Sequence, residues 1–201
     1  MLIEEQKGKI AMKITDKMLV EMANYTIERP GIPADWVYLG DNEERYVIGE
    51  PKEKNILIIG VNPGWSMPGT KRQTTLKVTE IIKQKFDADY GWIMVNLYPQ
   101  RSSKPKDITL PLDDTMIHNN LRVIEYVVKE FDIQKIWCAW GNAIDKVGNG
   151  VLHTSHKDIC EMINKLDGTH EWYHYGELTK KGNPRHPRFV PENWDMKPSQ
   201  P

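Results

Sequence analysis

The chain has 201 residues, of which 27 are basic and 28 acidic, and its formal net charge is −1 at pH 7. This length is enough for one α/β domain with a core and is short for two. The charged first 18 residues are unlike a secretory signal, and no apolar stretch has the length of a membrane span. With only two cysteines, the chain cannot form a disulfide framework or a Cys-based metal cluster. We expect a cytoplasmic monomer with no membrane association, cofactor or metal.

Hydrophobic spacing predicts helices and strands in alternation. The first half is predicted to form, in chain order, a helix over 13–25, an irregular segment over 29–42, a short edge strand over 44–49, a buried strand over 56–59, a helix over 75–86 and a buried strand over 92–97. Asp113 and Asp114 then supply a helix N-cap. The second half is predicted to form a helix over 115–130, a buried strand over 135–140, a helix over 157–166, a strand over 172–175 and a Pro-rich tail from Pro191.

The run Ile56–Ile59 indicates the fold class, because four consecutive aliphatic residues are typical of a strand buried on both faces of a sheet. Strands alternating with helices predict a three-layer α/β sandwich with a short, mainly parallel central sheet. We expect residues 51–191 to form this domain. Residues 1–50 should supply a helix and an irregular lead-in packed on the same domain, and residues 192–201 a loose tail.

Polar residues follow the predicted strands where each strand ends. Asn62 follows the first buried strand, Asn96 ends the second, Asn142 follows the third, and His186 comes about ten residues after the last. The carboxyl ends of parallel strands share one edge, so these residues can converge on a single crevice. Each also has an ordinary interpretation, since Asn is common in turns and at strand ends, where it satisfies loop backbone.

The charge distribution is uneven. Three windows, 69–77, 98–106 and 179–190, contain ten basic residues and no acidic residue, which leaves 17 basic and 28 acidic residues elsewhere. If the windows lie together, the protein is an acidic body with one positive face, as expected for a phosphate-bearing partner. For any single window, a solvated loop is the favoured interpretation.

The motifs resemble two families. Gly60–Gly64 (Gly-Val-Asn-Pro-Gly), Val95–Pro99 followed by Arg101, Gly141–Ala143 and His186–Pro187 resemble motifs of the mismatch-specific and single-strand-selective uracil-DNA glycosylases. A resemblance to the family called domain of unknown function 1643 covers more of the chain, roughly Arg45 to Pro191. It rests on segments that include Thr74–Thr75, Ala139–Gly141 and Leu178–Pro187.

The glycosylase resemblance implies hydrolysis of the N-glycosidic bond of a flipped nucleotide. Asn62 would orient the water, and His186 would donate to the departing base. Asn96 would bind the base edge, and Trp65 or Tyr98 would stack on its face. The full set implied to bind substrate is Gly60, Val61, Pro63, Gly64, Trp65, Asn96, Tyr98, Arg101 and Asn142. The set expected to bind phosphate is Lys71, Arg72, Lys104, Lys180, Lys181, Arg185 and Arg188.

The chain also departs from the glycosylase pattern. The family continues His-Pro with Ser and an apolar wedge, whereas this chain has Arg188 and Phe189, of which Phe189 can itself serve as a wedge. His153 and His156 have metal-like spacing but no evident third ligand, so we expect no metal site there. Nucleic acid or a nucleotide is the expected partner. The alternatives to a glycosylase-like enzyme are a non-catalytic module that binds nucleotides or single strands, and hydrolysis of a free nucleotide.

Overall fold

A computed structural model of the protein describes residues 11–27, 29–70, 72–191 and 193–201. Its centre is a seven-stranded mixed sheet in the order β1-β2-β4-β3-β5-β6-β7. Neighbouring strands are parallel from β4 through β3 and β5 to β6, and antiparallel at both edges. The strands are β1 (Val37–Gly40), β2 (Arg45–Glu50), β3 (Lys54–Gly60), β4 (Tyr90–Asn96), β5 (Lys135–Cys138), β6 (Glu171–Tyr175) and β7 (Met196–Pro198).

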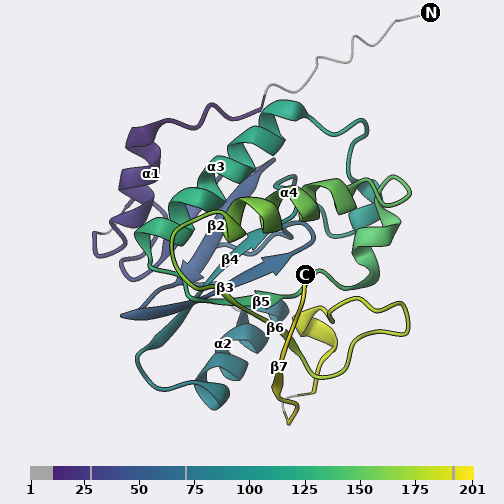
Figure 1. The fold of residues 1–201 in the computed structure, drawn as a ribbon. Coiled ribbons are helices and arrows are strands. Elements are labelled where there is room, and N and C mark those ends of the chain that lie inside the picture. Colours follow the sequence, from purple (N-terminus) through teal and green to yellow (C-terminus); the bar gives the residue numbers. More distant parts are fainter. Residues whose placement is uncertain (1–10, 28, 71, 192) are drawn as a thin grey trace, which may run out of the picture.

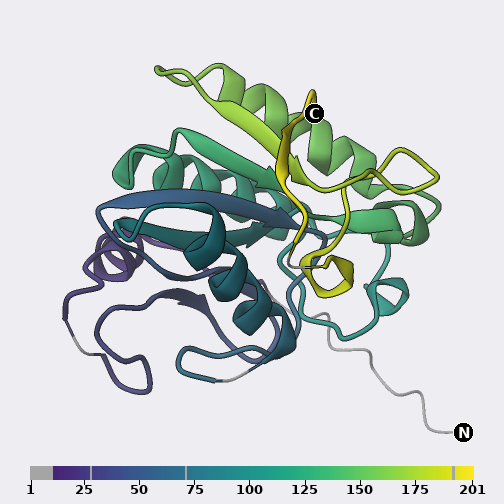
Figure 2. The same ribbon diagram turned by 90° about the horizontal axis from the view of Figure 1, so that it is seen from below.

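Helices cover both faces of the sheet (Figures 1 and 2). Helix α2 packs on one face, and α1, α3 and α4 pack on the other. The side chain of Asp113 caps α3 by accepting from the N–H of Met116, as its position in the sequence predicts. The helices are α1 (Asp16–Ala23), α2 (Gln73–Lys85), α3 (Asp114–Glu130) and α4 (Leu152–Asn164), with short 3₁₀ turns η1 (Pro105–Asp107), η2 (Gly141–Lys146) and η3 (Pro187–Phe189).

Strand β3 is buried on both faces. Leu57 and Ile59 contribute to the core beneath α1, α3 and α4, whereas Ile56 and Ile58 contribute to the core beneath α2. All four are at most 1% exposed. The prediction of an α/β fold with helices on both faces of a sheet is therefore confirmed. The prediction that the sheet is mainly parallel is not, because three of the six strand pairs are parallel and three are antiparallel.

The prediction of a short sheet is wrong, because both edges carry strands that the sequence pattern did not show. Strand β1 lies in the segment expected to be irregular, and its Val37 and Leu39 are buried. Strand β7 lies in the tail expected to be loose, and it pairs with β6. Pro198 is compatible with an edge strand, because an edge strand leaves one side of its backbone unpaired.

The tail is also held by a tight contact between Trp194 and Gly176. Gly176 has φ +65°, and its N–H donates to the carbonyl of Asp195. A Cβ on Gly176 would lie 1.8 Å from Cε3 of the Trp194 indole, so the ring occupies the space that only glycine leaves open.

The parallel strands place their carboxyl ends along one edge of the sheet. From β3 the chain crosses by way of α2 to β4 on one side, and from β4 it returns by way of α3 on the opposite face to β5 on the other side. A crevice forms where connections diverge in this way, here between β3 and β5. No helix among the described residues is long and apolar enough to span a bilayer.

We predict that Gly176→Ala detaches the tail. The substitution adds the cost of positive φ for a residue with a Cβ, about 1–2 kcal/mol, to a clash that Trp194 relieves only by leaving. The matched control is Gly182→Ala, because Gly182 has φ +82° and open space around its Cβ position. Urea unfolding should show a larger decrease in the free energy of unfolding for Gly176→Ala than for Gly182→Ala. The rate of amide hydrogen exchange in β7 should rise only in Gly176→Ala. Equal losses with β7 still protected would contradict a docked tail.

Candidate functional site

A cavity of about 620 Å³ opens at the carboxyl ends of the parallel strands. Four connections line it, namely those that follow β3, β4, β5 and β6. The lining residues are Val61, Asn62, Gly64, Trp65, Ser66, Arg72, Gln73, Thr74, Ser102, Ser103, Pro105, Trp140, Gly141, Asn142, Ala143, Lys146, Thr179, Arg185, His186, Arg188 and Phe189. The cavity thus lies where the topology predicts a binding crevice.

The amide of Asn62 is held in one orientation by neighbouring backbone. Its Nδ2 donates to the carbonyl of Ser102 at 2.9 Å, and lies 3.2 Å from that of Pro63 and 3.5 Å from that of Gln100. If the amide were turned over, its oxygen would face these carbonyl oxygens, and no hydrogen bond could form. Oδ1 is therefore the end of the Asn62 side chain that is left to accept a hydrogen bond in the cavity.

The imidazole of His186 is likewise fixed. Its Nδ1 accepts from the N–H of Arg188 at 3.1 Å, which caps η3. Burial, with a smaller contribution from the Arg188 charge, lowers the pKa of His186 to about 4. The ring is therefore neutral at pH 7 and carries its proton on Nε2. Gly141 packs against it, since a Cβ there would lie 3.4 Å from the Cβ of His186.

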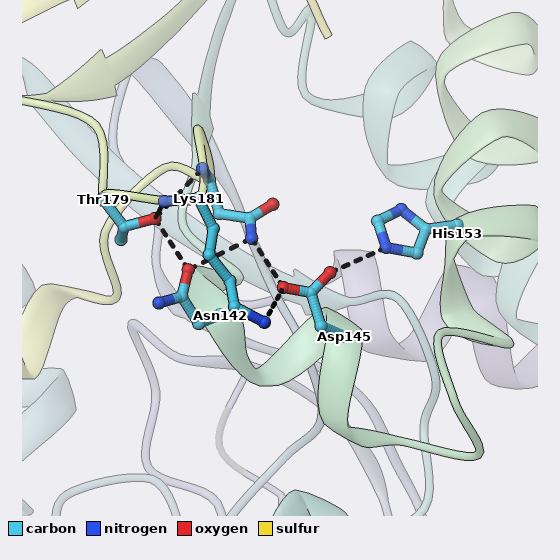
Figure 3. A network of polar contacts seen from close by, with 6 residues as sticks. Asn142, Asp145, His153, Thr179 and Lys181 are labelled. Carbon is cyan, nitrogen blue, oxygen red and sulfur yellow. Dashed lines mark hydrogen bonds and ion pairs between the residues drawn. The ribbon is translucent and has the colours of Figure 1, made fainter.

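Asn142 belongs to a polar network between η2 and the loop that follows β6 (Figure 3). Its Oδ1 accepts from the hydroxyl of Thr179 at 2.7 Å and from Nδ2 of Asn183 at 3.1 Å. The carboxylate of Asp145 accepts from the same Asn183 nitrogen and pairs with His153 and Lys181. These partners hold the pKa of Asp145 below its usual range, with the His153 hydrogen bond the largest contribution.

The cavity is strongly biased towards positive charge. Four of its lining residues, Arg72, Lys146, Arg185 and Arg188, are basic, and none of the described lining residues is acidic. The guanidinium of Arg185 donates hydrogen bonds to the carbonyls of Glu177 and Leu178 and lies over the ring of Trp194. The side chains of the other three have no carboxylate partner within the described part of the chain. Such a lining attracts an anion.

Asn96 and Tyr98, expected to contact the substrate, lie elsewhere. Asn96 is 2% exposed, its side chain lies against Gly60, and its Nδ2 has no partner among the described residues. Tyr98 is 1% exposed, and its hydroxyl accepts from the N–H of Asp113. Burial raises the pKa of Tyr98. Both side chains pack within the protein and do not line the cavity, so neither is retained as a substrate contact.

Arg101 also has a different place from the one expected. It is 6% exposed and donates to the carbonyls of Asp41 and Gly64 and to the hydroxyl of Tyr38. Its guanidinium lies 5.9 Å from the ring of Trp65, which lines the cavity. The donors of Arg101 are thus used on protein groups, and this residue supports the loop that carries Trp65.

The buried Arg45 supports the same loop by donating to the carbonyl of Ser66. Burial lowers the pKa of Arg45 to about 9, and the neighbouring charge of Arg101 acts in the same direction. Arg45 and Arg101 therefore both donate to backbone carbonyls of the loop that carries Trp65. Carbonyl groups accept hydrogen bonds but do little to neutralise the two positive charges.

The remaining predicted residues differ in whether they line the cavity. Gly60 and Pro63 lie beside the lining residues without lining the cavity. Lys104 and Lys180 are exposed and do not line the cavity, and Lys181 is paired with Asp145. Lys71 lies outside the described residues. The predicted residues that do line the cavity are Val61, Asn62, Gly64, Trp65, Arg72, Asn142, Arg185, His186 and Arg188.

Comparison with known protein families matches residues 45–188 to a family described as a protein of unknown function, DUF1643. The chain belongs to this family. The match includes β2 to β6 and every lining residue of the cavity except Phe189. No curated protein and no solved structure matches the chain.

Several lining residues of this DUF1643 protein were missed from the sequence. Lys146 follows the motif Gly141–Ala143 by three residues, and Ser102 and Ser103 follow Arg101 directly, so each is close to a motif that the sequence does show. Gln73 and Thr74 line the cavity because α2 begins there. No residue-type pattern separates these from ordinary loop residues.

The histidine pair with metal-like spacing has other contacts in the DUF1643 structure. His153 pairs with Asp145, and the ring of His156 lies 4.5 Å from that of Trp140. Burial lowers the pKa of His156. Among the described residues, no three His, Cys, Asp or Glu side chains are placed to bind a metal ion.

We predict that His186 titrates far below a free histidine. NMR of the imidazole C–H protons, assigned with a His186→Asn variant that retains a capping side chain, should give a midpoint near pH 4, against about 6.5 for the unfolded chain. Because the unfolded chain takes up this proton first, the contribution of His186 to stability should fall as the pH falls from 6.5 to 4. A midpoint at or above 6.5 would refute a neutral imidazole at this partly buried position.

Proposed function

We propose that the cavity binds a nucleotide, free or within nucleic acid, and hydrolyses its N-glycosidic bond. The observation that carries the proposal is the presence of Asn62 and His186 in one cavity, each with its hydrogen-bonding end fixed by the backbone. The volume of about 620 Å³ is in the range of small-molecule sites.

The two fixed side chains match the two needs of this reaction. In the hydrolysis, a water oxygen bonds to the anomeric carbon while the bond to the base nitrogen breaks, and the base leaves with the electron pair. The proton that the water loses passes to solvent water, because an amide cannot take it, and the departed base anion takes up a proton from the solvent. Oδ1 of Asn62 would accept from the water and so orient it. Nε2–H of His186 would donate to the base as negative charge develops, which a preorganised donor stabilises.

The basic residues of the cavity would bind phosphate. Arg72 lies at the start of α2, and Lys146 and Arg188 lie on the connections that follow β5 and β6. Trp65, which is 50% exposed, would stack on a base face. The motifs Gly60–Gly64 and His186–Pro187 resemble those of uracil-DNA glycosylases, and this resemblance supports the same reaction.

A second candidate function is nucleotide or single-strand binding without cleavage. The absence of a carboxylate among the described lining residues favours it, because an amide activates water less than a carboxylate does. The burial of Asn96 outside the cavity also favours it, since the expected contact to the base edge is missing.

The two functions are separated by a cleavage assay with Asn62→Ala. Oligonucleotides that contain uracil, hypoxanthine or a hydroxymethylated base are incubated with the protein and tested for abasic sites. We expect abasic sites with the wild type and a loss of at least about 100-fold in rate with Asn62→Ala. Retained oligonucleotide binding by the variant is the control for an intact cavity. Binding without abasic sites on every substrate would favour the binding module, and undiminished turnover by Asn62→Ala would remove Asn62 from the mechanism.

We also predict salt-dependent binding of oligonucleotides that depends on Arg72 and Arg188. Each Ala variant should weaken binding and reduce the slope of log K against log salt by about 0.7 for a single strand, because one phosphate contact is lost. Lys83→Ala removes the same charge from the opposite end of α2, where Lys83 is exposed, and is the control. Equal salt slopes for all three variants and the wild type would show that this cavity does not bind phosphate.

A further inference from the structure

The cavity presents a defined set of donors and acceptors. Oδ1 of Asn62 is an acceptor, whereas Nε2–H of His186 is a donor, as argued above from their partners. Asn142 adds a second donor. Its Oδ1 takes two hydrogen bonds, and its Nδ2 has no partner among the described residues.

The orientation of the Asn142 amide follows from the other hydrogen bonds that Thr179 and Asn183 make. The Thr179 hydroxyl accepts from the backbone N–H groups of Lys181 and Asn183, so its proton is directed to Asn142. The Asn183 Nδ2 donates to Asp145 as well as to Asn142. Turning the Asn142 amide over would set its NH₂ against these two donors. Figure 3 shows its oxygen facing Thr179, with its nitrogen on the other side.

We propose that Asn142 makes the cavity select nucleobases that present a carbonyl oxygen over those that present an exocyclic amino group. This inference rests on the proposed function in one respect, that a nucleobase occupies the cavity. Oδ1 of Asn62 is used for the water, so the base meets the donors of Asn142 and His186. A carbonyl oxygen accepts from such donors.

An amino group in the same place would meet N–H with N–H. Both donors would then lose their water partners without gaining an acceptor, which costs free energy. Sites built to hydrogen-bond one group reject an analogue that lacks it far more strongly than sites that discriminate by size. The basic lining residues, which are donors only, add to this bias.

Isothermal titration with matched nucleotides tests the selection. The members of each of the pairs dUMP with dCMP and dIMP with dAMP share sugar and phosphate. They differ at one edge of the base, where the first member presents an oxo group beside a ring N–H and the second presents an amino group beside an unprotonated ring nitrogen. The oxo member of each pair should bind at least about tenfold more tightly to the wild type, as one well-placed hydrogen bond discriminates.

Asn142→Asp keeps an oxygen for Thr179 and Asn183 and replaces the donor by an acceptor. The preference should disappear or reverse in this variant. Asn164→Asp is the matched control, because Asn164 lies at the end of α4 and its oxygen accepts from the Trp172 indole N–H, which the acid retains. Circular dichroism and thermal unfolding establish that both variants fold. If Asn142→Asp does not fold, Thr179→Val is used in its place. It removes one of the two hydrogen bonds to Oδ1 of Asn142 and should reduce the preference.

The outcomes separate this inference from the proposed function. If the wild type binds no nucleotide, either free in the titration or within the oligonucleotides of the cleavage assay, the proposed function fails and the selection fails with it. If both members of each pair bind the wild type equally, the selection is overturned while nucleotide binding stands. If the oxo preference persists in Asn142→Asp, a residue other than Asn142 selects the base and the inference is overturned.

Discussion

The cavity depends on the burial of β3 on both faces of the sheet. Its aliphatic side chains alternate between the core beneath α2 and the core beneath α1, α3 and α4. A strand in that position pairs in parallel with β4 and β5, so three connections leave the same edge. The turn that contains Asn62 and the turn that contains Asn142 are adjacent because their strands are adjacent. No contact between the turns themselves is needed to bring them together.

Hydrogen bonds to neighbouring groups then determine which atoms of these side chains are left to contact a ligand. An amide can present a donor or an acceptor, and which of the two it presents depends on what its other end contacts. In Asn62 the nitrogen contacts carbonyl oxygens, whereas in Asn142 the oxygen contacts a hydroxyl and an amide nitrogen. Two identical side chains therefore have opposite hydrogen-bonding roles in one cavity. The loops supply this difference, and the sheet supplies only the positions.

The same division explains how much the sequence predicts. The apolar run Ile56–Ile59 is a local signal, and it predicted a buried parallel strand and the polar residue after it. Asn96 ends strand β4 and Arg101 follows it closely, yet both lie inside the protein, because neighbouring side chains and carbonyls surround them. Burial of a loop residue depends on contacts distant in sequence. Strand β7 was missed for a similar reason, since its place depends on the fit of Trp194 against Gly176.

The electrostatics of the cavity limit the reactions that it can support. A site with basic residues and no carboxylate among its described lining stabilises negative charge well and removes protons poorly. The neutral imidazole of His186 also suits the cavity to binding an anion. It can donate a hydrogen bond to the anion without adding a positive charge that would repel Arg188. Such a cavity favours reactions in which a leaving group departs with the electron pair over reactions that begin with a strong base. Departure of a nucleobase from a sugar, the reaction that we propose, is of the first kind.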